Sequence, residues 1–352
     1  MAAKKAQKGK RSKPYVARFN LKLEYYLFQI QQELQAGTYT PGSYHAFHIH
    51  DPKKRLISAA PYRDRVVHHA LCNIIEPIFD QAFITDTYAN RKGKGIHAAI
   101  ARYQHYAKKY PYVLKADIRK YFPSIDHAIL KEEIRWKIAC PKTLHLIDTI
   151  IDGSNPQEGL LTYFKGDNLF TLQSRRKGLP IGNLTSQLWA NVYLARFDHW
   201  VEHTLKAPGY IRYVDDFVLF HPEKEVLKYY KTKIEEKLEG LRLRIHPTKS
   251  TIYPTSKGVP FLGFRVYPFH RTLLKQNYKR YRRNIKRKLE NYKIGKESAK
   301  GLESSINSWL LGHAAFGQNY FQKQQIIQDI YNSGVNLVKS ERSSWRLLEQ
   351  QQ

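Results

Sequence analysis

Residues 210–220, YIRYVDDFVLF, place two adjacent aspartates in the middle of an apolar run. The flanking halves are rich in β-branched and aromatic residues, which favours two short strands. A carboxylate buried in such a strand is costly unless a cation pairs with it. The stretch therefore predicts a hairpin whose turn presents Asp215 and Asp216 to a divalent metal ion, with an ordinary surface turn as the alternative.

A third carboxylate, Asp117, ends another short apolar strand, VLKADI at 113–118. Three carboxylates from two neighbouring strands can hold two Mg²⁺ ions about 3.5–4 Å apart, one to activate an attacking hydroxyl and one to stabilise a phosphate leaving group. Water and phosphate oxygens would complete the coordination. The predicted cofactor is a pair of Mg²⁺ ions, with Mn²⁺ as an alternative. Because nucleases use the same arrangement, the carboxylates alone leave the reaction open.

The rest of the chain switches between helical and extended periodicity. Helices are predicted at 19–36, 62–84, 93–110, 127–151, 186–205, 223–240 and about 275–340. Further strands are predicted at 44–50 and 261–267, and the Gly-, Asn- and Ser-rich residues 152–178 are expected to form a loop or hairpin. This order of elements predicts an α+β fold with a mainly antiparallel sheet that carries the aspartates.

The charge favours a polyanionic partner. Lys and Arg number 59 against 30 Asp and Glu, a formal net charge of +29, and 25 Tyr and 16 Phe are available to stack on bases. Neutralising phosphates releases counterions, so nucleic-acid binding should be strong and salt-sensitive. Acidic membranes or acidic proteins are the alternative partners of so basic a chain.

The chain is expected to be cytoplasmic. No apolar run approaches 18 residues, so no membrane span is predicted. The N-terminal residues 1–15 are basic and lack the hydrophobic stretch of a secretory signal. Two cysteines, Cys72 and Cys140, are too few for a disulfide framework, which favours a reducing compartment.

Seven ordered motifs between about residue 45 and residue 270 resemble those of reverse transcriptases. Two resemble fingers motifs, YRDRVVHHALCNIIEPIFD (62–80) and TYANRKGKGIHAAI (87–100). KADIRKYFPSIDH (115–127), GLPIGNLTSQLWANVYL (178–194) and YVDD (213–216) resemble the first metal-binding, the nucleotide-contacting and the catalytic palm motifs. RLRIHPTKST (242–251) and FLGFRVY (261–267) resemble the two motifs that follow. The resemblance implies RNA-directed DNA synthesis, with template RNA, cDNA and dNTP as partners.

The same resemblance implies a right-hand polymerase with fingers, palm and helical thumb. Residues 1–18 are expected to be a basic disordered tail, serving as a solubilising segment or a nucleic-acid-binding arm. The expected divisions are fingers at 19–112, palm at 113–126, fingers or an insertion at 127–176, palm at 177–272 and thumb at 273–345.

Two strings resemble one subfamily, the reverse transcriptases of diversity-generating retroelements: GNLTSQ (182–187) and NSWLLGHAAFG (307–317). Such enzymes copy a template-repeat RNA with errors at adenines and work with a small basic helical accessory protein. The chain shows no ribonuclease H segment and no cysteine-rich endonuclease. The alternatives are a group II intron-like or antiviral-defence reverse transcriptase, an RNA-binding maturase-like protein that no longer polymerises, and a two-metal nuclease.

The resemblance also implies roles near the metals. Asp117, Asp215 and Asp216 would bind metal together with the carbonyl of Ile118. The ring of Phe122 matches the position that rejects a ribose 2′-hydroxyl, with ordinary core packing as the alternative. Lys249 resembles the lysine that protonates leaving pyrophosphate, a general-acid role.

Further residues are expected to contact the incoming nucleotide. Lys54 and Arg55 match the fingers positions that hold the triphosphate, and Arg63 and Arg65 are further candidates, because a guanidinium grips phosphate oxygens bidentately. The nucleotide-contacting motif contributes Ile181, Gly182 and Gln187.

Ile181 departs from the common family pattern, in which a glutamine precedes this glycine. Isoleucine can neither donate nor accept a hydrogen bond, so geometric discrimination between nucleotides should weaken by ~1–3 kcal/mol. Ile181 is therefore expected to contribute to error-prone copying, with simple packing as the alternative.

The segment KRYRRNIKRK at 279–288 has seven Lys or Arg among ten residues. A groove that follows the template–primer backbone is expected here, with a solvated basic helix as the alternative. The candidate contacts are Lys279, Arg280, Arg282, Arg283, Lys286 and Arg287.

Overall fold

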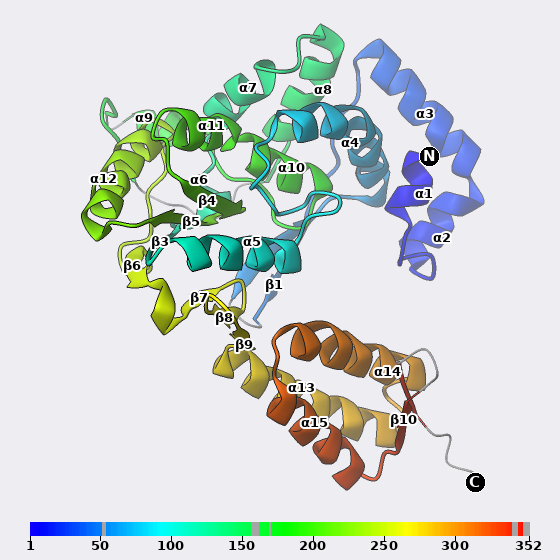
Figure 1. Cartoon of the computed structure of the whole chain (residues 1–352). Coiled ribbons are helices and arrows are strands. Elements are labelled where there is room, and N and C mark those ends of the chain that lie inside the picture. The colour runs from blue at the N-terminus through cyan, green and yellow to red at the C-terminus, as the bar shows by residue number, and fades with distance from the viewer. Residues whose placement is uncertain (51–53, 156–161, 169, 340–343, 348–352) are drawn as a thin grey trace. The chain divides into compact units, whose positions relative to one another are not determined.

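The structure is a computed structural model of the chain, and it describes all residues except 51–53, 156–161, 169, 340–343 and 348–352 (Figure 1). The chain divides into two compact units. The first comprises Met1–Gly95 and Leu114–Ile252, and the second comprises Ile96–Val113 and Tyr253–Gln352. Each unit has its own buried core.

A four-stranded sheet organises the first unit, in the order β4-β5-β3-β6. β4 (Gly209–Tyr213) and β5 (Asp216–His221) form an antiparallel hairpin, and β3 (Tyr112–Asp117) and β6 (Thr251–Pro254) complete the sheet. The predicted hairpin and the predicted α+β fold class are confirmed.

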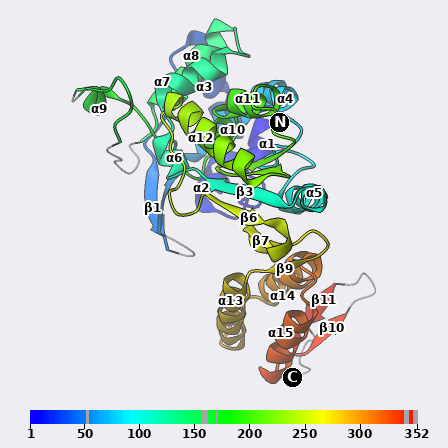
Figure 2. The same cartoon turned by 60° about the vertical axis from the view of Figure 1, so that its left-hand side comes forward.

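Two helices cover β5. α12 (Lys224–Gly240) packs against the strand (Figure 2), and Leu227 and Ile234 of this helix are buried. α11 (Ala195–His203) brings Phe197 edge-on to Phe217 of β5, with the ring centroids 5.9 Å apart. Burial of such apolar side chains is the main favourable contribution to the stability of this sheet.

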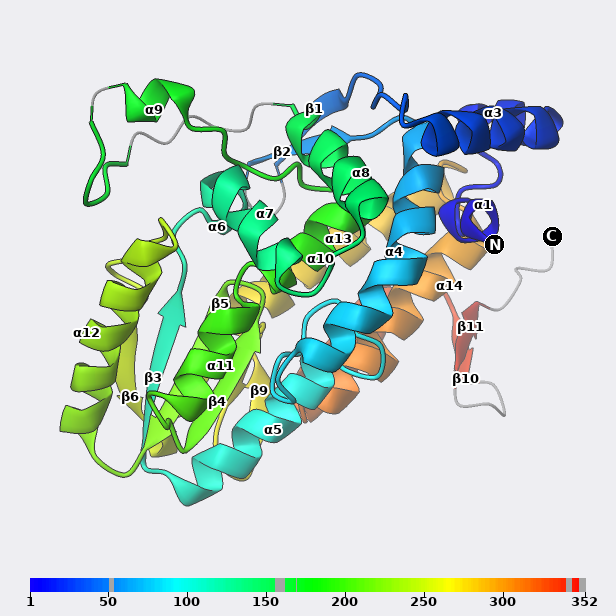
Figure 3. The same cartoon turned by 90° about the horizontal axis from the view of Figure 1, so that it is seen from above.

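α4 (Tyr62–Ala82) is the central helix of the rest of this unit, and α10 (Leu184–Val192) packs against it (Figure 3). Its buried residues recur at helical spacing, as the sequence predicts. They include Val66, Val67, Leu71, Ile75 and Phe79.

The N-terminal residues differ from the expectation of disorder. They form α1 (Ala2–Ala6) and α2 (Pro14–Leu21), and both helices pack on α4. Ala6 and Val16 are buried, although Lys and Arg surround them in the sequence. Because the helices that carry these two residues contact α4, their burial offsets a composition typical of disorder.

Two long predicted helices are each divided in two. Residues 127–151 form α7 (His127–Arg135) and α8 (Pro141–Asp152), because Pro141 has no N–H to continue a helix and starts a new one. Residues 186–205 lie in α10 and α11, which are separated at Tyr193 and Leu194. Neither of these two residues is a helix breaker, so tertiary packing sets this second division.

The remaining elements of the first unit are short, apart from one helix. β1 (His45–Ile49) and β2 (Arg55–Ala59) form an antiparallel hairpin. The helices are α3 (Leu23–Ala36), α6 (Tyr121–Ser124) and α9 (Thr171–Ser174).

The second unit joins α5 (Ile96–Lys109) to the C-terminal part of the chain, whereas the sequence analysis assigned these residues to the fingers. A three-stranded sheet, β7 (Val259–Phe261), β8 (Phe264–Val266) and β9 (Arg271–Leu273), follows the short 3-10 helix Thr255–Lys257. Tyr103 of α5 packs on Phe261 with the ring centroids 5.3 Å apart.

The C-terminal helices of this unit form a bundle in the region where the sequence predicts a helical segment. They are α13 (Lys275–Lys293), α14 (Ala299–Asn307), the π-helix Ser308–Ala314 and α15 (Tyr320–Asn332). Tyr281 of α13 stacks on Trp309 with the ring centroids 4.4 Å apart. A short hairpin, β10 (Leu337–Lys339) and β11 (Trp345–Leu347), follows where a helix was expected.

Among the helices that the structure describes, none has the length and apolar character needed to cross a membrane. Cys72 is buried and Cys140 is exposed, and neither forms a disulfide.

One buried histidine gives the first unit a predicted dependence on pH. His68 on α4 is 1% exposed, and neither of its ring nitrogens has a hydrogen-bond partner among the described residues. Burial, followed by the charges of His69 and Arg65, lowers the pKa of His68 from 6.5 to about 4. Between these two values the unfolded chain binds the proton and the folded chain does not. Stability is therefore fully present above pH 6.5 and is lost as the pH falls toward 4.

Between pH 7.5 and pH 4.5, the unfolding free energy of the wild-type chain should fall by about 2–3 kcal/mol more than that of a His68→Leu chain. Urea unfolding at the two pH values measures this difference. Equal losses in the two chains would show that His68 does not titrate in this way.

Candidate active site

The two aspartates lie at a tight hairpin turn. Tyr213 pairs with Asp216 across the hairpin, so Val214 and Asp215 form the turn itself. Val214 has φ 58°, in the left-handed region that a β-branched residue rarely adopts. Such a conformation persists only where surrounding contacts hold it.

The end of β3 is hydrogen-bonded to this turn. The amide of Ile118 donates to the carbonyl of Asp215 at 3.1 Å. The amide of His246 donates to the carbonyl of Asp117 at 2.6 Å. The neighbouring ends of β3 and the hairpin thus bring Asp117, Asp215 and Asp216 into one region.

The carboxylates of this region repel one another. Burial, then the charge of Asp216, and less strongly the charge of Asp117, raise the pKa of Asp215 to about 6. The charge of Arg55 acts in the opposite direction. A bound dication would relieve this repulsion, because an opposite charge favours the ionised carboxylate.

The donor set fits magnesium, which prefers a few carboxylates together with oxygens from water and phosphate. In the described part of the chain, however, no three His, Cys, Asp or Glu side chains lie close enough together to hold a metal ion. The three aspartates thus lie in one region, but their side chains are not close enough together to form a complete metal-binding site.

Lys249 contacts one of these aspartates. Its Nζ donates to Oδ1 of Asp117 at 3.0 Å, and both side chains are partly exposed. The contact places an ammonium group beside the carboxylate at the end of β3.

A fully buried arginine holds the turn. Arg212 and Asp198 are both 0% exposed. Nε of Arg212 donates to Oδ1 of Asp198 at 2.7 Å, and Nη2 donates to Oδ2 at 2.6 Å. Nη1 donates to the carbonyl of Val214 at 3.0 Å. Although burial acts to lower it, the Asp198 carboxylate raises the pKa of Arg212 above its ordinary value.

The same pair forms hydrogen bonds with three further residues. The hydroxyls of Tyr210 and Thr87 donate to Asp198 at 2.7 and 3.0 Å. Nη2 of Arg212 donates to the carbonyl of Asn191 on α10 at 3.3 Å. Because a buried pair needs its hydrogen bonds satisfied, this network fixes the left-handed Val214 conformation.

Arg212 was not among the site residues predicted from the sequence. Its position in the apolar half-strand YIRYV could have indicated its role. A buried guanidinium, like a buried carboxylate, is costly unless an opposite charge pairs with it.

The nucleotide-contacting motif packs between α6 and β2. The amide of Leu179 donates to the carbonyl of Phe122 at 2.9 Å, and the amide of Ser58 donates to the carbonyl of Ile181 at 3.0 Å. Gly182 has φ 117°, and a Cβ there would lie 3.2 Å from Ile57, so another residue would be strained. Phe122 is half-buried.

Gln187 is exposed on α10, whereas the neighbouring Ser186 is buried. The fully buried Tyr121, next to Phe122, donates its hydroxyl to the carbonyl of Ala190 at 2.6 Å. α6 is thereby held against α10.

The four predicted fingers cations have different surroundings. Lys54 and Arg55 are exposed, and the charge of Arg55 reaches Asp215. Arg63 forms an ion pair with Glu33, and Nε of Arg65 donates to the carbonyl of Ala60 at 2.8 Å. The charge of Arg55 thus acts on Asp215, whereas Arg63 and Arg65 have structural contacts elsewhere.

The basic segment of the thumb forms most of α13. Arg282 pairs with Asp329 of α15, with Nε 2.5 Å from Oδ2, so this side chain joins two helices. Arg280 is half-buried. The other four predicted contacts are exposed: Lys279, Arg283, Lys286 and Arg287.

The reverse transcriptase (RNA-dependent DNA polymerase) family matches residues 49–266, which is more than half of the chain. The chain therefore belongs to the reverse transcriptase family, as the order of motifs implies. This membership confirms the predicted class of enzyme, RNA-directed DNA polymerase.

Two relatives are similar in sequence. Protein YkfC of Escherichia coli K12 is 24% identical over 277 residues, which cover 67% of this chain and 70% of that protein. The group II intron-encoded protein LtrA of Lactococcus lactis subsp. cremoris is 26% identical over 176 residues, which cover 49% of this chain and 28% of that protein.

A solved structure, apo telomerase from Candida tropicalis, shares the fold with a TM-score of 0.52 at 12% identity. The likeness covers 84% of this chain and 59% of the telomerase chain. The chain thus spans less than two thirds of the telomerase chain and little more than a quarter of LtrA.

Proposed function

We propose that this protein copies a template-repeat RNA into error-prone, adenine-mutagenic cDNA as the reverse transcriptase of a diversity-generating retroelement. The observation that carries polymerisation is the hairpin turn that brings Asp215 beside the end of β3, in a chain of the reverse transcriptase family. The GNLTSQ string and Ile181 support the finer assignment.

Each residue near the turn has a proposed role. Two Mg²⁺ ions, held by Asp117, Asp215, Asp216 and the carbonyl of Ile118, would activate the primer hydroxyl and neutralise phosphate charge. Lys249, beside Asp117, would hold a proton for the leaving pyrophosphate.

Other residues would select the nucleotide. Phe122, which is half-buried, would restrict the space at the sugar and so favour dNTP. The exposed Lys54 and Arg55 would hold the triphosphate, since phosphate oxygens accept charge-assisted hydrogen bonds.

Template RNA and the growing cDNA would bind through phosphate contacts. The exposed cations of α13 and the net charge of +29 support a salt-sensitive interaction with the duplex backbone. A small basic helical accessory protein would be the further partner. With its template RNA bound, the working enzyme would be a ribonucleoprotein.

Restoring a polar side chain at position 181 should reduce errors. With Ile181→Gln, misincorporation opposite template adenine is expected to fall by about tenfold, because the glutamine can hydrogen-bond near the sugar and templating base. Sequencing cDNA made on an RNA template with all four bases, with and without the accessory protein, measures the change. Ile181→Val, which stays apolar, is the control. Unchanged errors in the Ile181→Gln enzyme would contradict the role of this residue.

The similarity to LtrA favours a second candidate, a group II intron-like reverse transcriptase. An antiviral-defence reverse transcriptase is a further alternative of the same enzyme class. The same cDNA separates these candidates. Errors concentrated opposite adenine support the diversity-generating assignment, whereas accurate cDNA supports the intron-like or defence assignment.

A further inference from the structure

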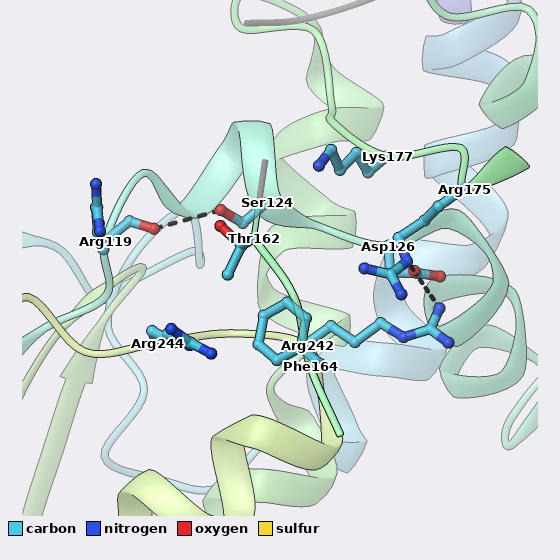
Figure 4. A pocket seen from close by; sticks show the side chains of 9 residues that line it. All are labelled: Arg119, Ser124, Asp126, Thr162, Phe164, Arg175, Lys177, Arg242 and Arg244. Atoms are coloured by element: carbon cyan, nitrogen blue, oxygen red, sulfur yellow. Dashed lines mark hydrogen bonds and ion pairs between the residues drawn. The ribbon is translucent and has the colours of Figure 1, made fainter. Parts of the chain in front are cut away.

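A basic pocket lies in the first unit beyond the end of β3 (Figure 4). Residues from three parts of the chain that are far apart in the sequence line it: 119–126, then 162–164 with 175–177, and 242–244. Five cationic side chains line it: Arg119, Arg175, Lys177, Arg242 and Arg244.

Carboxylates neutralise only part of this charge. Nη1 of Arg242 donates to Oδ2 of Asp126 at 2.6 Å, and Arg175 forms an ion pair with Asp167. Asp126 also accepts the amide of Ala128 at 2.9 Å as the N-cap of α7. Among the described residues, Arg119 and Arg244 form no ion pair with a carboxylate, so their positive charge is not compensated in this way.

One buried donor lacks an acceptor. The Arg175 side chain is 4% exposed, and its Nε has no hydrogen-bond partner among the described residues, since Oδ2 of Asp126 lies 3.6 Å away. Burial, and next the charge of Arg175, lower the pKa of Lys177. A buried donor and crowded cations would both be stabilised by an anion.

The pocket is the size of a single oxyanion. Its volume is about 30 Å³, whereas one water molecule needs roughly 10–15 Å³ by the same measure. The ring of Phe164 lies between two of the guanidinium groups, 5.2 Å from that of Arg244 and 5.9 Å from that of Arg175. A nucleoside would not fit, but one tetrahedral phosphate group would.

One residue of the pocket is also close to Asp117 in the sequence. Arg119 follows Asp117 by two residues, and its amide donates to the carbonyl of Arg244 at 2.8 Å. We propose that this basic pocket binds a phosphate group, either of released pyrophosphate or of a nucleic-acid backbone. Binding at this site does not require that the protein polymerises.

The test measures binding to the full chain without divalent metal, so that no metal bridges the probe to the aspartates. Calorimetry with inorganic pyrophosphate is one arm, and fluorescence anisotropy with an RNA–DNA duplex is the other. The variant is Arg119→Gln/Arg244→Gln, since both side chains are exposed and their loss should leave the fold intact. Lys224→Gln, an exposed cation on α12, is the control.

The double variant should bind the phosphate-bearing probe about tenfold more weakly than the control does. A loss in the pyrophosphate arm would identify the leaving group as the source, and a loss confined to the duplex arm would identify the strand backbone. Equal affinities of variant and control in both arms would overturn the proposal, whether or not the enzyme makes cDNA.

Discussion

A chain with Asp215→Asn and Asp216→Asn is expected to lose RNA-templated DNA synthesis by about three orders of magnitude or more, since metal-bound carboxylates supply several kcal/mol of transition-state stabilisation. Asparagine keeps the shape of the turn, and the backbone bond from Ile118 to the carbonyl of Asp215 does not depend on the side chain. Single-turnover primer extension measures the loss.

The fold of this variant should persist. Burial and neighbouring charge raise the pKa of Asp215, so the ionised carboxylate is not what stabilises the hairpin. Asp148→Asn, at an ion pair with Arg135 on a different helix, is the control and should retain activity. If the activity of the double variant stays within tenfold of the control, these aspartates do not take part in catalysis.

Arg212→Lys should have the second largest effect. Lysine keeps the charge, but its single ammonium cannot reproduce the fork that binds both oxygens of Asp198 and the carbonyl of Val214. We expect kcat to fall by about 10- to 100-fold while KM for template–primer changes little. The Mg²⁺ concentration for half-maximal activity should rise several-fold, because the turn no longer holds its aspartates in place.

A loss of stability alone does not test this role. Breaking a buried pair costs about 3–5 kcal/mol, so Arg212→Lys should also lower the unfolding free energy. Arg91→Lys is the matched control, because Arg91 also pairs with a carboxylate, Asp80, and donates to the carbonyl of Ile84. If both variants lose stability and neither changes the Mg²⁺ dependence, Arg212 is structural and does not position the turn.

Periodicity and the cost of buried charge were sufficient to predict the centre of the fold. Asp215 and Asp216 interrupt apolar half-strands, and the hairpin forms where this pattern predicts it. The order of strands in the sheet was not predicted, because β5 lies between β4 and β3 through pairing between distant segments.

The N-terminal helices were missed for a related reason. Val16 and Ala6 give no visible periodicity within a lysine-rich segment, and their burial depends on α4, which lies far along the chain. The N-terminal helices are therefore stabilised by packing on α4 more than by local helix propensity.

The residue types of the candidate site could be predicted from the sequence, but the pairing and direction of their side chains could not. Asp198 lies in a helix where an acid normally faces solvent, so its pairing with Arg212 was not visible in the sequence. The sequence also could not distinguish Arg55, whose charge reaches Asp215, from Arg63, which pairs with Glu33. Side-chain direction depends on tertiary contacts that the motifs do not encode.

Primer extension with a DNA primer on an RNA template, with Mg²⁺ and either dNTP or rNTP, tests RNA-templated DNA synthesis. We expect template-directed extension with dNTP and little or none with rNTP. No extension with the accessory protein and cognate RNA present would contradict polymerisation and favour an RNA-binding protein. Degradation of the RNA without dNTP would contradict polymerisation in favour of a nuclease.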